Sequence, residues 1–168
     1  LLLDGIGQLN EWLDDALKPL TADQLNWLPP EGKMVSAGFA AWHVIRTQDN
    51  LANFVFAKTP PVWIAEGYFE RMNLPKVDQG TGMSLEAARE VRFADVALLR
   101  EYGAKVDASV KQVLGNMSLE LLNEIQMVRP LGEMPRWKVF RQVFMTHGFM
   151  HLGEVNALKG MMGMQFGI

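Results

Sequence analysis

Three histidines are the residues of this sequence whose type and spacing could bind a metal ion. His147 and His151 lie four residues apart in THGFMHLGEV, and His43 lies in AAWHVIRTQDN. On a helix, residues four apart have Cβ atoms about 5–6 Å apart, so two imidazoles can converge on one ion. Three imidazoles with one open position are a normal ligand set for a catalytic divalent metal, whereas structural zinc usually has four protein ligands. The histidines therefore predict a metal site with an open position.

Helical periodicity places these histidines where a core is expected. His43 shares its helix face with Thr47 and Asn50, at spacings of four and three. In the last helical stretch, one stripe repeats at spacings of three and four and consists of Phe140, Phe144, His147, His151, Val155 and Leu158. Buried imidazoles without a partner would cost desolvation energy, which favours a shared ligand. The alternative, core histidines bonded to backbone or water, stays open at this stage.

Glu154 lies at the edge of the same stripe, three residues after His151. A carboxylate in this place can orient a ligand histidine through a hydrogen bond, or it can act as a base. It can equally be a solvated carboxylate at the helix edge. The sequence leaves all three roles open, and no other residue has a clear catalytic assignment.

The elements that must position these side chains are helices. Apolar residues recur at helical spacing in four long segments, 2–20, 36–58, 84–114 and 135–162, and strand signals are nearly absent. The third segment should turn one stripe inward, consisting of Val91, Ala94, Leu98, Tyr102, Val106, Val110 and Val113. We expect an all-α four-helix bundle, with 59–83 as a long crossover between the second and third helices. The 168 residues should form a single domain, 1–168.

Composition excludes several classes of partner. The net charge is −3 and no Lys/Arg stripe stands out, which argues against nucleic acid as the main partner. No apolar run approaches the roughly 20 residues of a membrane span, and the first residues carry acids where a signal peptide carries bases. The sequence has no cysteine, so it provides no cysteine nucleophile, and we expect a cytoplasmic protein. Five tryptophans and eleven methionines suggest more apolar surface than one bundle hides, hence a homodimer.

Three stretches resemble the DinB-like superfamily of metal-binding four-helix bundles. They are WHVIRTQDN, WIAEGYFERMNLPKVDQGTGMS and HGFMHLGEVNALKG. The family pattern has one histidine in the second helix and an HxxxH pair in the last, matched here by His43, His147 and His151. The resemblance implies a divalent metal, zinc or nickel, and a homodimer. Members resemble S-transferases and isomerases that use a low-molecular-weight thiol such as bacillithiol or mycothiol.

Combined with the absence of cysteine, the resemblance makes a metal-dependent thiol S-transferase the leading hypothesis. A three-histidine metal would deprotonate an incoming thiol, which then attacks an electrophilic substrate. Two alternatives stay open: a non-catalytic protein that binds a metal or small ligand, and a hydrolase that activates water at the same site.

Overall fold

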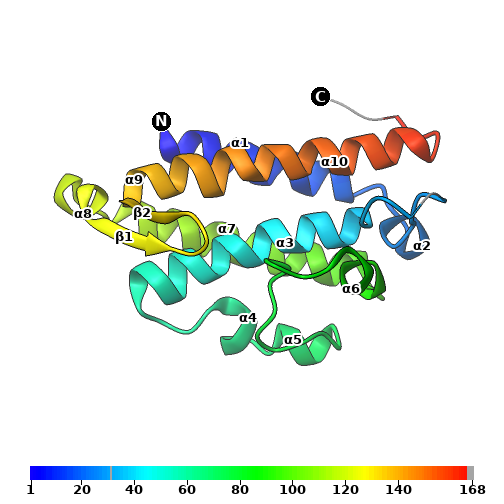
Figure 1. The fold of residues 1–168 in the computed structure, drawn as a ribbon, viewed down its shortest axis with the longest axis horizontal. Coiled ribbons are helices and arrows are strands. Elements are labelled where there is room, and N and C mark those ends of the chain that lie inside the picture. Colours follow the sequence, from blue (N-terminus) through cyan, green and yellow to red (C-terminus); the bar gives the residue numbers. More distant parts are fainter. Residues whose placement is uncertain (31, 166–168) are drawn as a thin grey trace.

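Four long helices form a bundle in the computed structural model, which describes residues 1–30 and 32–165 (Figure 1). The bundle consists of α1 (Leu2–Leu17), α3 (Ala37–Asp49) extended by the π-helix η1 (Asn50–Ala57), α7 (Val96–Gly115), and a last helix built from α9 (Arg136–Val139), the π-helix η2 (Phe140–Thr146) and α10 (His147–Met161). Both α1 and α3 contact α7 and α10, so the four helices enclose one core. The predicted all-α four-helix bundle is confirmed.

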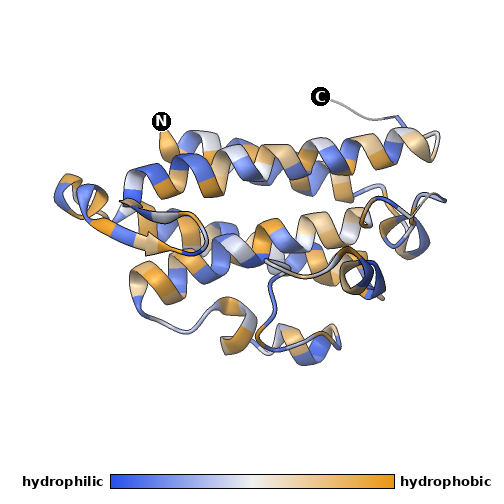
Figure 2. Ribbon diagram, viewed as in Figure 1, coloured by the Kyte–Doolittle hydropathy of each residue, from blue (hydrophilic) through white to orange (hydrophobic). Residues whose placement is uncertain are grey.

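Amphipathic patterning explains this packing. Hydrophobic and hydrophilic residues alternate along each long helix (Figure 2), as expected when one face is buried and the other is wet. The stripe predicted for the last helix faces inward, with Phe140, Phe144, Val155 and Leu158 almost fully buried. Among the described residues, no helix combines the length and apolar content that a membrane span requires.

Short elements fill the connections between the long helices. They are α2 (Ala22–Leu25), α4 (Val62–Ala65), α5 (Tyr68–Arg71), α6 (Leu85–Glu90) and α8 (Leu119–Asn123). The predicted crossover between the second and third long helices is confirmed, and it contains α4 and α5. Its return segment runs back along α3 toward α6 (Figure 1).

The prediction of one continuous third helix from 84 to 114 is wrong. Helix α6 ends at Glu90 and α7 begins at Val96. The Asn26 side chain donates to the Phe93 carbonyl (2.7 Å) and accepts from the Phe93 amide (2.9 Å), which replaces helical hydrogen bonds there. The Asp95 side chain then caps α7 by accepting from Ala97 N (2.8 Å).

This break changes the phase of the predicted inward stripe. Phe93 and Leu99 are buried in place of Ala94 and Leu98, which are exposed and half-buried. The predicted positions Val91, Tyr102, Val106 and Val110 are buried. Val113 is half-buried, and its neighbour Leu114 is buried. The predicted stripe is therefore correct from Tyr102 to Val110, but the tertiary contact from Asn26 could not be read from the pattern.

The structure also contains a small β-hairpin, in a chain whose sequence has almost no strand signals. Strands β1 (Ile125–Val128) and β2 (Gly132–Pro135) pair antiparallel, with Val128 opposite Gly132. The loop between them has three residues and is followed by Gly132 at φ +88°, a left-handed conformation that glycine adopts without strain. The strands have four residues each, too few for alternation to show in the sequence.

Two bundle helices change to π-helical hydrogen bonding near the histidines. Segment η1 continues α3, which carries His43, and η2 ends at Thr146, immediately before His147. π-Helical segments are rare and often occur at functional sites. Here they shape the helices on both sides of the cavity described below.

Candidate metal centre

The three histidines converge although His43 comes from α3 and the other two from α10. Nε2 of His147 lies 3.2 Å from Nε2 of His43 and 3.0 Å from Nε2 of His151. All three candidate ligand atoms lie within 4.8 Å of one another. Two nitrogens bound to one tetrahedral zinc ion at about 2.0–2.1 Å would lie about 3.3–3.4 Å apart. The donor set and its spacing therefore fit a divalent metal ion.

Hydrogen bonds on the opposite ring nitrogens orient two of the imidazoles. His43 Nδ1 lies 2.5 Å from the Gln79 carbonyl, and His151 Nδ1 lies 2.7 Å from Glu154 Oε2. Because both partners are acceptors, each Nδ1 carries the proton and donates it. The Nε2 lone pairs of His43 and His151 consequently face the centre, as metal ligation requires.

The surroundings favour the neutral form of two of the imidazoles, those of His43 and His147. Burial lowers the pKa of His43, opposed by the hydrogen bond to the Gln79 carbonyl. Burial also lowers the pKa of His147 to about 4, with the charges of His151 and His43 acting in the same direction. The pKa of Glu154 is lowered, chiefly by its hydrogen bond with His151. At neutral pH, His43 and His147 thus offer lone pairs beside the ionised carboxylate of Glu154.

A cavity of about 760 Å³ opens beside the centre. His43 and His147 line it, and His151 does not. Its other walls are α3 and η1, the 79–82 loop, the β-hairpin and η2, and its volume lies in the range of small-molecule sites. A ligand in this cavity would reach the centre past His43 and His147.

The crossover is held against α3 by a buried aspartate. Asp49 is fully buried; Oδ1 accepts from Val62 N (2.8 Å) and Oδ2 from Trp63 N (2.9 Å). The Trp63 indole donates to the Lys76 carbonyl (3.1 Å), and Arg46 Nε donates to the Asp78 carbonyl (3.3 Å). These bonds fix the return segment, and this segment places the Gln79 carbonyl on His43.

Gly80 is the position where a side chain would disturb this contact most directly. It has φ +89°, and a Cβ would lie 2.8 Å from His43 Nδ1 and 3.0 Å from Phe39 Cζ. We expect Gly80→Ala to displace the loop, break the Gln79–His43 hydrogen bond and weaken metal affinity about 10–100-fold, the usual cost of losing such a partner. Competition with a chelating dye measures the affinity.

Gly82→Ala is the matched control for that variant. Gly82 also has a positive φ (+77°), but a Cβ there meets nothing within 4 Å. It has a similar backbone strain without the contact to His43. Equal metal affinities of the two variants would show that the Gly80 contact does not matter.

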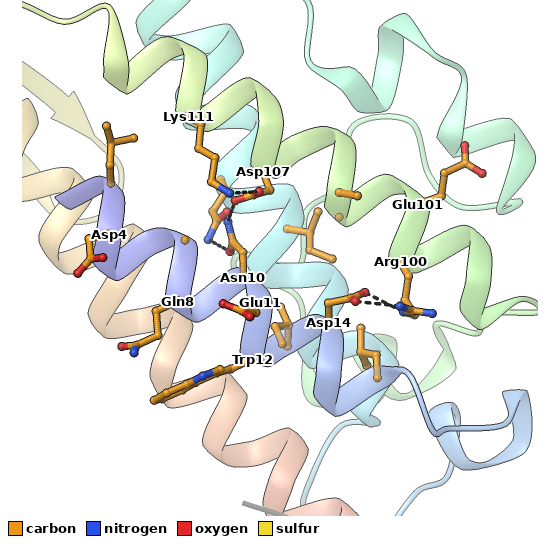
Figure 3. A pocket seen from close by; sticks show the side chains of 18 of the residues that line it. Asp4, Gln8, Asn10, Glu11, Trp12, Asp14, Arg100, Glu101, Asp107 and Lys111 are labelled. Atoms are coloured by element: carbon orange, nitrogen blue, oxygen red, sulfur yellow. Dashed lines mark hydrogen bonds and ion pairs between the residues drawn. The ribbon is translucent and has the colours of Figure 1, made fainter. Parts of the chain in front are cut away.

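A second cavity, of about 880 Å³, lies between α1 and α7 and contains no histidine (Figure 3). Two ion pairs lie in it: Asp14 of α1 with Arg100 of α7 (2.7 Å), and Asp107 with Lys111 (2.6 Å), both on α7. Asn10 also donates to Asp107 (2.9 Å). The Asp14–Arg100 ion pair and the Asn10–Asp107 hydrogen bond therefore join α1 to α7.

The structure brings together all four residues that the sequence singled out, His43, His147, His151 and Glu154. Sequence reasoning missed the Gln79 carbonyl, which is a backbone group without a side-chain signature. It also missed the hairpin wall. The two glycines in QGTG were a usable signal, because both have positive φ and Gly80 lets the loop approach His43 closely.

Comparison with known proteins agrees with this architecture. A solved structure of a conserved protein from Enterococcus faecalis superposes with a TM-score of 0.84, covering 97% of this chain and 96% of that chain at 21% identity. At this identity the likeness shows the fold. No curated protein matches the sequence. The model of the DinB superfamily matches residues 8–155, most of the chain. The chain therefore belongs to the DinB superfamily.

Proposed function

We propose that His43, His147 and His151 bind one divalent ion, zinc or nickel, and that the protein is a metal-dependent thiol S-transferase. One observation carries the proposal: three Nε2 atoms converge, and two of their histidines, His43 and His147, line a cavity that can hold a small molecule. Membership of the DinB superfamily supports it. The substrates would be a low-molecular-weight thiol and a small electrophile.

The groups around the histidines and the walls of the cavity have different roles in this proposal. The Gln79 carbonyl and the Glu154 carboxylate hold His43 and His151 as Nε2 donors, so Glu154 acts as an orienting residue. A divalent ion held by the three imidazoles would lower the pKa of a thiol or water molecule in the open position. The cavity walls would orient the two reactants relative to each other.

The cavity favours a thiol over water as the nucleophile. A free thiol has a pKa of about 8.5 and water about 15.7, so water needs more help to lose its proton. Among the described residues that line the cavity there is no aspartate or glutamate to act as a general base. Since the sequence also has no cysteine, the thiolate would come from the cosubstrate.

A conjugation assay tests the proposed function. Protein loaded with zinc or nickel is mixed with 2-mercaptoethanol or cysteine and with 1-chloro-2,4-dinitrobenzene or monochlorobimane. We expect conjugation above the uncatalysed rate, lost with a chelator, restored by metal and absent in His147→Ala. Conjugation no faster than the uncatalysed reaction, with or without metal, would indicate a non-catalytic binding protein. Metal-dependent hydrolysis of p-nitrophenyl acetate without thiol transfer would indicate a hydrolase.

The single domain 1–168, the homodimer and the cytoplasmic location stay predictions from composition and resemblance. Apolar side chains do remain exposed on α8, the hairpin and α9, namely Leu119, Ile125, Leu131 and Trp137. Such side chains are compatible with a contact between two copies.

A further inference from the structure

The cavity beside the histidines has an uneven distribution of charge and polarity. Much of its wall is apolar and consists of Leu51, Val55, Met127, Val128, Leu131, Val143 and Met150. Among its described lining residues, Arg129 is the one side chain that carries a full charge at neutral pH, and no carboxylate of the lining balances it. A ligand that fills this space would therefore have an apolar body and meet a positive group at the hairpin.

Arg129 is the one described arginine that both lines this cavity and has no ion pair; Arg89, Arg92 and Arg141 also form no ion pair with a described residue, but they do not line the cavity. Arg71, Arg100 and Arg136 each form an ion pair, with Glu101 (3.0 Å), Asp14 (2.7 Å) and Glu124 (2.8 Å) respectively. Arg129 lies in the hairpin loop, is exposed, and forms no ion pair with any described residue. Its guanidinium is free to form a two-point contact with a carboxylate or phosphate.

Thr47 provides a second, independent sign of a missing ligand. It lies one turn after His43, lines the cavity and is 6% exposed, yet its Oγ1 has no hydrogen-bond partner. A threonine in a helix commonly bonds the carbonyl four residues earlier, and a buried polar atom without a partner costs stability. Because Thr47 lines the cavity, a polar atom of a bound ligand would satisfy this hydroxyl.

From these observations we infer that this cavity binds a small molecule with an apolar body and one anionic group, a carboxylate or phosphate. Arg129 binds the anionic group, and the Thr47 hydroxyl bonds a polar atom closer to the histidines. The inference rests on the proposed function for the identity of the cavity as a substrate site. It adds the charge class of the substrate and two residues that determine specificity.

Calorimetric binding of probes without a thiol tests the charge class separately from the chemistry. The probes are 3-phenylpropionate, phenyl phosphate and the neutral 3-phenylpropanol, each titrated into zinc-loaded protein. Wild-type protein should bind at least one anionic probe about tenfold more tightly than the alcohol. Hydrogen bonds to charged groups contribute enough for Arg129→Gln to lower that affinity tenfold or more. The two anions distinguish a carboxylate from a phosphate substrate.

Arg141→Gln is the matched control, because it removes the same charge from an exposed residue of η2 that does not line the cavity. It should leave all three affinities within about twofold, at the same zinc content as Arg129→Gln. Equal losses in the two variants, or an alcohol that binds as tightly as both anions, would overturn the inference. A retained anion preference without any thiol transfer would instead contradict the proposed function alone.

Thr47→Val separates ligand binding from a structural role. Valine has a similar shape and removes a buried hydroxyl without a partner, so the variant should unfold at an equal or higher urea concentration than wild type. It should nevertheless bind the preferred anionic probe several-fold more weakly. A variant with unchanged probe affinity would remove Thr47 from the proposed site.

Discussion

His43→Ala is expected to lose nearly all of the bound metal while the bundle stays folded. His43 provides one of three Nε2 donors and comes from a helix 104 residues away from His147 in sequence. Loss of an outer partner of a metal ligand costs about 10–100-fold in affinity, and loss of a ligand itself should cost more. Chelator competition measures the affinity, and circular dichroism verifies the fold.

Asn50→Ala provides the control for this variant. Asn50 lies two turns after His43 and lines the same cavity, but it is outside the histidine cluster. It should keep one ion per chain with little change in affinity. If folded His43→Ala retains full metal occupancy, the ligand set proposed here is wrong.

Asp49→Ala should produce the largest loss of stability. The Asp49 carboxyl group is fully buried and accepts four hydrogen bonds, from Asn53 Nδ2, Val62 N, Trp63 N and the Tyr102 hydroxyl, at 2.7–2.9 Å. Alanine would leave these donors buried without an acceptor. Removing one partner from a buried polar network costs about 3–5 kcal/mol. Urea denaturation measures this as a lower free energy of unfolding.

The midpoint of thermal unfolding should fall by roughly 6–20 °C in the same variant. Asp15→Ala is the control, since Asp15 is exposed on α1, and its unfolding free energy should change by no more than about 0.5 kcal/mol. Metal affinity should also fall in Asp49→Ala, because the crossover that carries Gln79 is anchored through Asp49. A loss of stability below 1 kcal/mol would show that this network is not what holds the crossover.

The sequence predicted the features that depend on local periodicity. Helical spacing alone placed His147 and His151 on the face that also carries Phe140, Phe144 and Val155, and the structure has them there. The start of α3 after Ser36 was also predictable, because the Ser36 hydroxyl caps it by accepting from Phe39 N (3.1 Å). The contact of His43 with His147 and His151 was predicted from the family pattern, together with the position of His43 on the inward face of its helix.

Features that depend on distant contacts could not be predicted. The side-chain bonds of Asn26 to Phe93 break the third helix, and nothing near Phe93 in sequence signals this partner. The π-helical segments have nearly the same residue types as α-helices, so the sequence did not indicate where the hydrogen bonding would change. Nothing in the sequence distinguishes Arg129 from other charged residues, because it is the hairpin that places it at the cavity. Asp49 is likewise one of nineteen Asp and Glu residues in the sequence.

The most direct test of the metal centre is elemental analysis of the purified protein combined with X-ray absorption spectroscopy at the edge of the metal found. The proposed centre requires one divalent ion per chain, with three imidazole nitrogens at about 2.0–2.2 Å and at least one further light ligand. His147→Ala should lose this imidazole signature. Protein that holds no ion after incubation with zinc or nickel, or an ion whose shell contains no imidazole, would contradict it.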